Sequence, residues 1–196
     1  MNPNSALPTR RLERGTSITQ AQPWQTGPVQ LDSPALSVMT DLLLVKAATT
    51  QPSTTLLQAE QIMIYQGVRM LFVVTEMPAV EGIITSTDLR GDRQLRVVHD
   101  RHMRYDELCV ADVMTPLAML DAIDFDLMKT ATVNNMIATL KQFGRNHLLV
   151  VEHAGAPGGQ RVRGVISRAQ IERQLGVVID VPEVASTFAE LGQMLA

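Results

Sequence analysis

A hydroxyl side chain and a carboxylate stand three residues apart at the end of a short apolar run, as Thr85 and Asp88. An ionised carboxylate accepts hydrogen bonds from both adjacent hydroxyls of a ribose, and a threonine hydroxyl bonds a ribose or phosphate oxygen. A helix that begins directly after Thr85 would also favour phosphate through its free N–H groups and its dipole. The same spacing suits a cap on that helix, so the pair predicts either a nucleotide contact or a structural cap.

This motif occurs twice. Residues 82–89 read GIITSTDL and residues 164–171 read GVISRAQI, so a glycine, a β-branched pair and a hydroxyl residue recur in order. The second copy has Gln170 where the first has Asp88. Loss of a charged hydrogen bond costs about 1.5–3 kcal/mol, or about ten-fold to a hundred-fold in affinity. We therefore expect one competent site in the first copy and a weaker one in the second.

The elements that must position these motifs also repeat. Helical spacing of apolar residues predicts one helix that stops at Gly67 and another that stops at Gly144. Each glycine precedes an apolar run, 71–74 or 148–151, that predicts a buried strand, and a turn then leads into a third strand. Each copy is expected to be β-α-β-β-α. Two copies should pack together, because one alone has too small a core.

Composition bounds the class of protein. The chain has 196 residues, of which 45% are hydrophobic and 19% charged, as in a globular protein. The net charge of −3 provides no basic field for nucleic acid, and the single cysteine, Cys109, agrees with a reducing compartment. The sequence shows no signal peptide, and its apolar runs are too short to span a bilayer. We expect a cytoplasmic protein with no membrane or nucleic-acid partner.

Four segments follow from these patterns. Residues 1–33, rich in Pro, Gln, Ser and Thr, predict a flexible or extended arm; 34–107 hold the first repeat with a connecting helix, and 108–178 the second repeat. Residues 179–196 predict an amphipathic helix that packs on its own core or across a dimer interface. Its apolar stripe comprises Val184, Phe188, Leu191 and Leu195.

The ordered repeat resembles tandem CBS domains, small paired modules named after cystathionine β-synthase, over residues 34–178. The resemblance rests on Val-Met-Thr at 38–40 and 113–115, Pro-x-x-x-Leu-x-x-Ala at 52–59, the glycine before each apolar strand, and Gly-Ile-Ile-Thr-x-x-Asp ending at Asp88. It implies an α+β fold in which two repeats pack through their sheets about a pseudo-twofold axis. It also implies two clefts that bind AMP, ADP, ATP or S-adenosylmethionine.

The resemblance also implies roles for particular residues. In the first cleft, 45–47 would contact adenine, Ile84 would form the floor, and Arg69 would contact phosphate. The expected ligand-binding residues of this cleft are Val45, Lys46, Ala47, Arg69, Ile84, Thr85, Thr87 and Asp88. Those of the second, weaker cleft are Asn146, His147, Ile166, Ser167, Arg168 and Gln170.

The sequence is compatible with more than one function. An enzyme is not expected, because known catalytic motifs are missing and His99 and His102 lack a third metal ligand. A DNA-binding regulator would need a helix-turn-helix and a basic face. The expected function is a non-enzymatic sensor of an adenine nucleotide that acts through its own dimer or an unknown protein partner. The alternative, a ligand-free homodimeric interaction scaffold, stays open.

Overall fold

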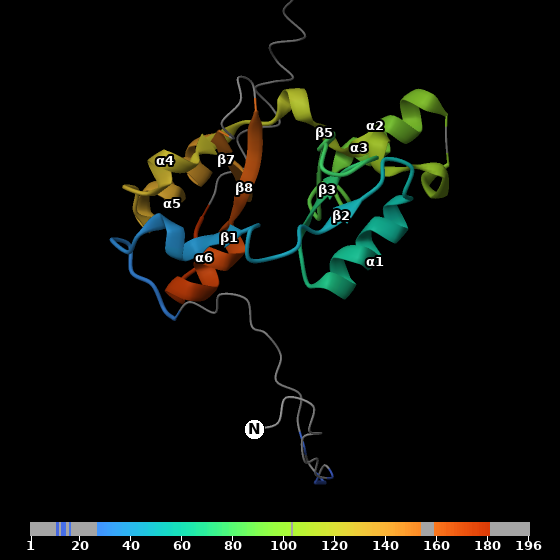
Figure 1. Cartoon of the computed structure of the whole chain (residues 1–196). Helices are drawn as coiled ribbons and strands as arrows, with labels where there is room; N and C mark the ends of the chain where they lie inside the picture. The colour runs from blue at the N-terminus through green and yellow to red at the C-terminus, as the bar shows by residue number, and fades with distance from the viewer. Residues whose placement is uncertain are drawn as a thin grey trace, which may run out of the picture.

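The chain folds into two four-stranded sheets, each flanked by helices (Figure 1). This computed structural model describes residues 11, 13–14, 16, 27–102, 104–153 and 159–180. The expected C-terminal helix and most of the expected N-terminal arm therefore lie outside the described residues. The expected α+β class is confirmed.

The first sheet belongs mainly to the first repeat. Its strand order is β2 (Thr49–Thr50), β3 (Met70–Val73), β4 (Gly82–Thr85) and β5 (Thr115–Pro116). The helices of this half are α1 (Leu56–Gln66), α2 (Asp92–Arg101), the short 3-10 helix η2 (Tyr105–Glu107) and α3 (Val110–Val113). Another short 3-10 helix, η3 (Leu117–Met119), follows β5. The expected β-α-β-β-α order is present as β2-α1-β3-β4-α2.

The second sheet has the matching order. Its strands are β6 (Ala122–Asp124), β7 (His147–His153), β8 (Gln160–Ser167) and β1 (Met39–Asp41). Its helices are η1 (Ala35–Val38), α4 (Phe125–Met128), α5 (Val133–Phe143) and α6 (Arg168–Leu175). The second repeat thus runs β6-α5-β7-β8-α6, with the extra turn of α4 after β6.

Local sequence explains where the two main helices begin and end. The Thr55 hydroxyl accepts from the Gln58 backbone N–H while the Gln58 side chain accepts from the Thr55 N–H, and the Thr132–Asn135 pair does the same for α5. Gly67 ends α1 at φ +65°, and an equivalent left-handed glycine ends α5. The predicted helix stops are confirmed.

Each repeat supplies a strand to the sheet of the other. β1 lies near the start of the first repeat but pairs with β8, and β5 lies near the start of the second repeat but pairs with β4. The glycine that opens each motif makes room for this exchange: a Cβ on Gly82 would lie 2.3 Å from the Thr115 carbonyl oxygen, and one on Gly164 would lie 2.7 Å from the Met39 sulfur. Close packing against the exchanged strand therefore requires a glycine at both positions.

Three apolar clusters form the interior. One packs α1 and α3 against the first sheet, and a second packs α5 and α6 against the second sheet. The third joins the two sheets, with Phe72 and Ile83 of the first beside Leu149 and Val165 of the second. The sheets therefore bury their second faces against each other, which explains why their strands are apolar on both sides.

Candidate functional site

The Thr85–Asp88 pair closes a turn at the end of β4. Asp88 Oδ2 accepts from the Thr85 N–H at 2.8 Å and from the Thr85 hydroxyl at 2.7 Å, and the Asp88 N–H lies 3.3 Å from the Thr85 hydroxyl oxygen. Leu89, buried next in sequence, anchors the turn in the core. Asp88 Oδ1 has no hydrogen-bond partner among the described residues. One carboxylate oxygen thus builds the turn, and the other is left free of hydrogen bonds from described residues.

The expected helix N-terminus is absent from this motif. Residues 86–90 form turns, and α2 begins only at Asp92 after the cap residue Gly91. The Gln94 side chain, which is buried, donates to the Asp88 carbonyl oxygen at 2.8 Å and ties this turn to α2. The prediction that a helix dipole at Thr85 helps to hold phosphate is therefore wrong, because the Asp88 carboxylate folds the chain into a separate turn first.

Gln94 is also a residue that the sequence analysis missed. A glutamine inside a helix normally faces solvent, and burial of its amide requires a partner. The position of Gln94 in the first turn of α2 gives no local sequence signal for its contact with Asp88.

The second copy of the motif is built differently. α6 starts at Arg168 immediately after Ser167, with no side-chain cap. Gln170 uses its amide within the helix: it donates to Gln174 at 3.0 Å and accepts from Arg173. The copy with the carboxylate thus lacks a helix N-terminus at the hydroxyl, and the copy with that N-terminus lacks the carboxylate. The two sites are unequal in geometry as well as in charge.

In each site, the apolar residue that faces the other sheet is one position earlier in the sequence than the residue expected at the ligand. Ile84 and Ile166 are fully buried in the cores beneath the helices. Ile83 and Val165 face the space between the sheets. The placement of Ile84 and Ile166 at the ligand is therefore corrected, because successive strand residues point to opposite faces.

The sheet register gathers the remaining expected residues at one end of each sheet. β2 runs parallel to β3 and β4 runs antiparallel to it, so the segment before β2, the start of β3 and the end of β4 share one end. In the segment before β2, Lys46 is exposed, Val45 is half-buried, and Ala47 packs against the inter-sheet cluster. In the second sheet, His147 pairs directly with Ser167 at the matching end.

The two ends meet. The Asn146 amide lies 3.4 Å from the Thr87 hydroxyl and joins the two repeats. His147 has its Nδ1 buried without a hydrogen-bond partner. Burial, followed by the positive charges of Arg69 and Arg168, lowers the pKa of His147 to about 4. We call Arg69, Thr87, Asn146, His147 and Arg168 the junction cluster.

The junction cluster contains two guanidinium groups, those of Arg69 and Arg168. His147 is neutral at pH 7 because its pKa is about 4, so the charge comes from the two guanidinium groups. Arg168 has Glu172 at 3.5 Å, whereas Arg69 has no ion pair with a described residue. Residues expected in two separate clefts therefore lie in one group that both repeats share, with the carboxylate of Glu172 beside Arg168 and that of Asp88 in the turn that holds Thr87.

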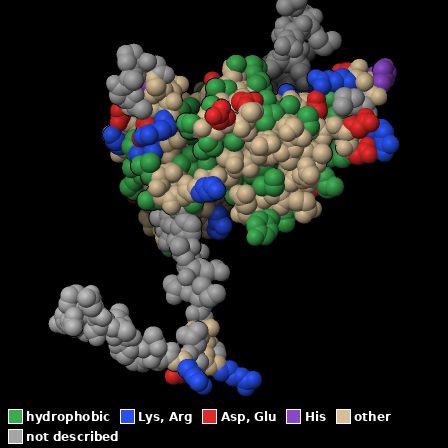
Figure 2. Space-filling view, turned by 45° about the vertical axis from the view of Figure 1, so that its right-hand side comes forward, with side chains coloured by type: hydrophobic (Ala, Val, Ile, Leu, Met, Phe, Trp, Pro, Cys, Tyr) green, Lys and Arg blue, Asp and Glu red, His purple; other side chains and the backbone are tan. Residues whose placement is uncertain are grey.

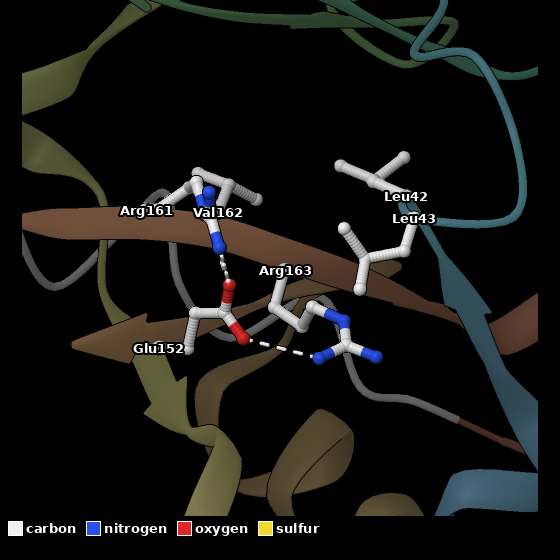
Figure 3. Close-up of a pocket in the computed structure, with 6 residues that line it drawn as sticks. All are labelled: Leu42, Leu43, Glu152, Arg161, Val162 and Arg163. Carbon is white, nitrogen blue, oxygen red and sulfur yellow. Dashed lines mark hydrogen bonds and ion pairs between the residues drawn. The ribbon is translucent and has the colours of Figure 1, made fainter. Parts of the chain in front are cut away.

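The rest of the described surface has other features. On the face shown in Figure 2, acidic and basic side chains gather mainly at the two outer ends, with hydrophobic side chains between them. Among the described residues, no cluster of three His, Cys, Asp or Glu could hold a metal ion, and no helix has the length and apolar character needed to cross a membrane. Two pockets surround Arg163, towards the other end of β8; Figure 3 shows one of them.

Comparison with known proteins identifies relatives of this architecture. Residues 37–92 match the family model described as CBS domain, and no curated protein matches the sequence. The crystal structure of an uncharacterized conserved protein from Pyrococcus horikoshii is similar at 20% identity with a TM-score of 0.52, over 74% of this chain and 93% of that one. A protein with CBS domains from Burkholderia ambifaria is similar at 19% identity and a TM-score of 0.50, over 81% and 93%.

A further solved structure, CBSX2 in complex with AMP, is 19% identical with a TM-score of 0.49, over 72% of this chain and 94% of that one. At these identities the likeness extends to the fold alone.

Proposed function

We propose that this chain is a tandem CBS-domain protein, and that it is a regulatory module that binds one adenine nucleotide where its two repeats meet. One observation carries the proposal: the available Asp88 oxygen belongs to the Thr85–Asp88 turn, whose Thr87 is bonded to the junction cluster residue Asn146. A carboxylate suits a ribose diol, and arginines suit a phosphate.

Different residues would contact different parts of the nucleotide. Asp88 Oδ1 would accept from the ribose hydroxyls, while Arg69 and Arg168 would hold phosphate. Asn146, whose contact with Thr87 is long at 3.4 Å, would exchange that contact for a phosphate oxygen. Ala47 and Ile83, which face the inter-sheet cluster, would pack against the base.

The charge of the site also ranks the expected ligands. Two guanidinium groups favour AMP, ADP or ATP, whose phosphates are anionic. S-adenosylmethionine carries a sulfonium cation, which the same groups repel. The second copy would remain weak, because Gln170 uses its amide inside α6.

Signalling would follow from the shared position of the ligand. Arg69 belongs to the first repeat and Arg168 to the second, so a bridging phosphate favours the arrangement in which both are close. A ligand shifts an equilibrium only by its difference in affinity between two arrangements. Nucleotide binding would thus tighten the junction, and a partner or the dimer would read that change.

The test compares Asp88→Asn with wild type in calorimetric titrations with AMP, ADP, ATP and S-adenosylmethionine. Asparagine retains an oxygen for the Thr85 turn but presents an N–H₂ group to the ribose. Loss of the charged hydrogen bonds should weaken nucleotide binding about ten-fold to a hundred-fold. Asp88→Ala is less informative, because it also removes the acceptor of the Thr85 N–H.

Gln170→Ala is the matched control in the second repeat and should leave the affinity unchanged. Thermal unfolding provides a second readout: nucleotide at a hundred times its dissociation constant adds about 2.7 kcal/mol of stability. Equal affinities of wild type and Asp88→Asn for every nucleotide would exclude Asp88 as the ribose ligand.

A ligand-free interaction scaffold is the second candidate, and the outer face of α1 favours it. Leu57, Ile64 and Tyr65 are exposed there, with Tyr65 at 92%. The equivalent positions of α5 are polar: Asn134, Lys141 and Gln142. An apolar face on one repeat alone suits protein association. A scaffold would show no thermal shift with any nucleotide.

A further inference from the structure

A second hollow lies away from the junction, on the helix-bearing side of the second sheet. This pocket has a volume of about 300 Å³. Its apolar wall consists of Leu36, Met39, Leu44 and Phe125, and its polar wall of Ser37, Asp41 and Arg163. The leucines lie at the mouth, since Leu44 is 73% exposed and Leu36 is 38% exposed. Exposed leucines around a concave apolar surface indicate that something covers it.

The polar wall offers little to a charged ligand. Arg163 donates from Nε and Nη2 to the two oxygens of Asp41, at 2.9 and 2.7 Å, and from Nη1 to Glu152 at 3.1 Å. Its guanidinium also lies 4.6 Å from the centre of the Phe125 ring. An anion would have to compete with two carboxylates for this arginine. The occupant is therefore expected to be apolar.

The end of the described chain lies in the same core. Ile179 is 5% exposed and belongs to the cluster that contains Met39, with Phe125 packed against it. Its backbone N–H donates to Glu172 at 2.9 Å, so the chain is held in place up to this residue. Residues 181–196 follow, and their sequence contains no Lys or Arg.

The sequence after Ile179 carries an apolar stripe. Val184 follows Ile179 by five residues, which span about 8 Å as helix and about 16 Å when extended. The apolar stripe then continues to the end of the sequence with Phe188, Leu191 and Leu195. An amphipathic segment of this kind needs an apolar surface within reach of its attachment point.

We propose that residues 181–196 occupy this pocket in the same chain and place their apolar stripe over Leu36, Leu44 and Phe125. The segment would then hold β1 in the second sheet, because the pocket lies against that strand. It would act independently of the nucleotide site.

The experiment uses the full chain with one fluorescent reporter. Trp24 is changed to Phe, which leaves no other tryptophan, and Phe188→Trp places an indole in the proposed contact. The emission should lie at the short wavelength of a buried indole. Leu44→Asp should shift it to longer wavelength, because the charge enters the pocket mouth. Leu43→Asp, a neighbour that is 65% exposed but does not line this pocket, should leave the emission unchanged.

Dilution distinguishes a pocket occupied by the same chain from a pocket occupied by a second copy. Emission that stays constant over a hundred-fold dilution supports contact within one chain, whereas a shift on dilution would overturn it in favour of a second copy. Emission of an exposed indole in the parent protein, or equal shifts with Leu43→Asp and Leu44→Asp, would also overturn the proposal. Hydrogen exchange of residues 36–44 should quicken with Phe188→Asp, and unchanged exchange would contradict the docking.

Discussion

At the scale of the residue, Asp88 has a structural and a candidate binding role at once. Its Oδ2 builds the turn with Thr85, while Oδ1 has no partner among the described residues. A structural role and a ribose contact were alternatives in the sequence, but the proposed ribose contact would use a different carboxylate oxygen from the turn, so the two roles do not conflict. The same turn presents Thr87 to the junction, so a change in the turn would alter the contact between repeats.

His147 makes stability depend on pH. Its pKa is about 4 in the folded protein, against 6.5 for an ordinary histidine, so between these pH values the unfolded chain binds more protons. Its contribution is present above pH 6.5 and is lost as the pH falls towards 4. The shift corresponds to about 3 kcal/mol in the free energy of unfolding. Urea unfolding between pH 7 and 4 should show this loss.

His147→Met, which installs the residue found at the equivalent position of the first repeat, should remove that part of the pH dependence. Carboxylates such as Asp41 and Asp112, whose pKa values are also lowered, act equally in both proteins. The difference between the two pH profiles therefore isolates His147. Parallel profiles would show that this histidine titrates normally. A bound phosphate should raise its pKa.

At the scale of the element, β1 depends on one ion-pair network. Arg163 on β8 joins Asp41 of β1 to Glu152 of β7, and the three side chains are each less than 20% exposed. Figure 3 shows Arg161 reaching the same glutamate from the other side. Hydrogen bonds from Arg163 hold the pKa of Asp41 below its usual value. The network therefore holds a strand of the first repeat in the sheet of the second repeat.

Arg163→Met should therefore destabilise the protein by about 2–4 kcal/mol, because it leaves the half-buried Asp41 without its ion-pair partner and leaves Glu152 with Arg161 alone. Arg161→Met is the matched control: Arg161 shares the Glu152 partner but is 63% exposed, so its loss should cost under about 1 kcal/mol. Denaturant unfolding measures both. Equal losses of stability in the two variants would mean that the ion pair between Arg163 and Asp41 does not stabilise the protein.

At the scale of the whole molecule, the inter-sheet cluster makes one unit of two repeats. Phe72 lies in it with 4% of its surface exposed, beside Leu149 of the other sheet. The exchange of β1 and β5 adds backbone hydrogen bonds between the halves. The two repeats are therefore expected to unfold together.

Phe72→Ala should lower the free energy of unfolding by about 3–5 kcal/mol, through lost burial and a cavity. Hydrogen exchange should report this loss in β7 and β8 as well as in the first sheet, because unfolding is shared. Leu57→Ala, at an exposed position of α1, is the control and should change little. Slow exchange preserved in β7 and β8 of the Phe72 variant would show that the repeats unfold separately.

The local sequence was sufficient for the repeat, the helix limits and the buried strands. The residues that begin and end the two main helices act on the backbone within a few positions of themselves, so their effect can be predicted from the sequence alone. These residues are Thr55, Thr132, Gly67 and Gly144. The Thr85–Asp88 spacing predicted a cap on a helix that begins directly after Thr85, whereas the pair closes a separate turn before α2.

Only the tertiary structure decided which partner each strand takes and which face each residue presents. Ile83 and Ile84 are both apolar and lie on a strand buried on both sides, so no alternation marks the one that faces the other sheet. The junction cluster unites Arg69 with Arg168 through sheet register and inter-sheet packing, which act between residues far apart in the chain. Chemistry at one motif could be read from its own side chains, but the shared site required the contact between the repeats.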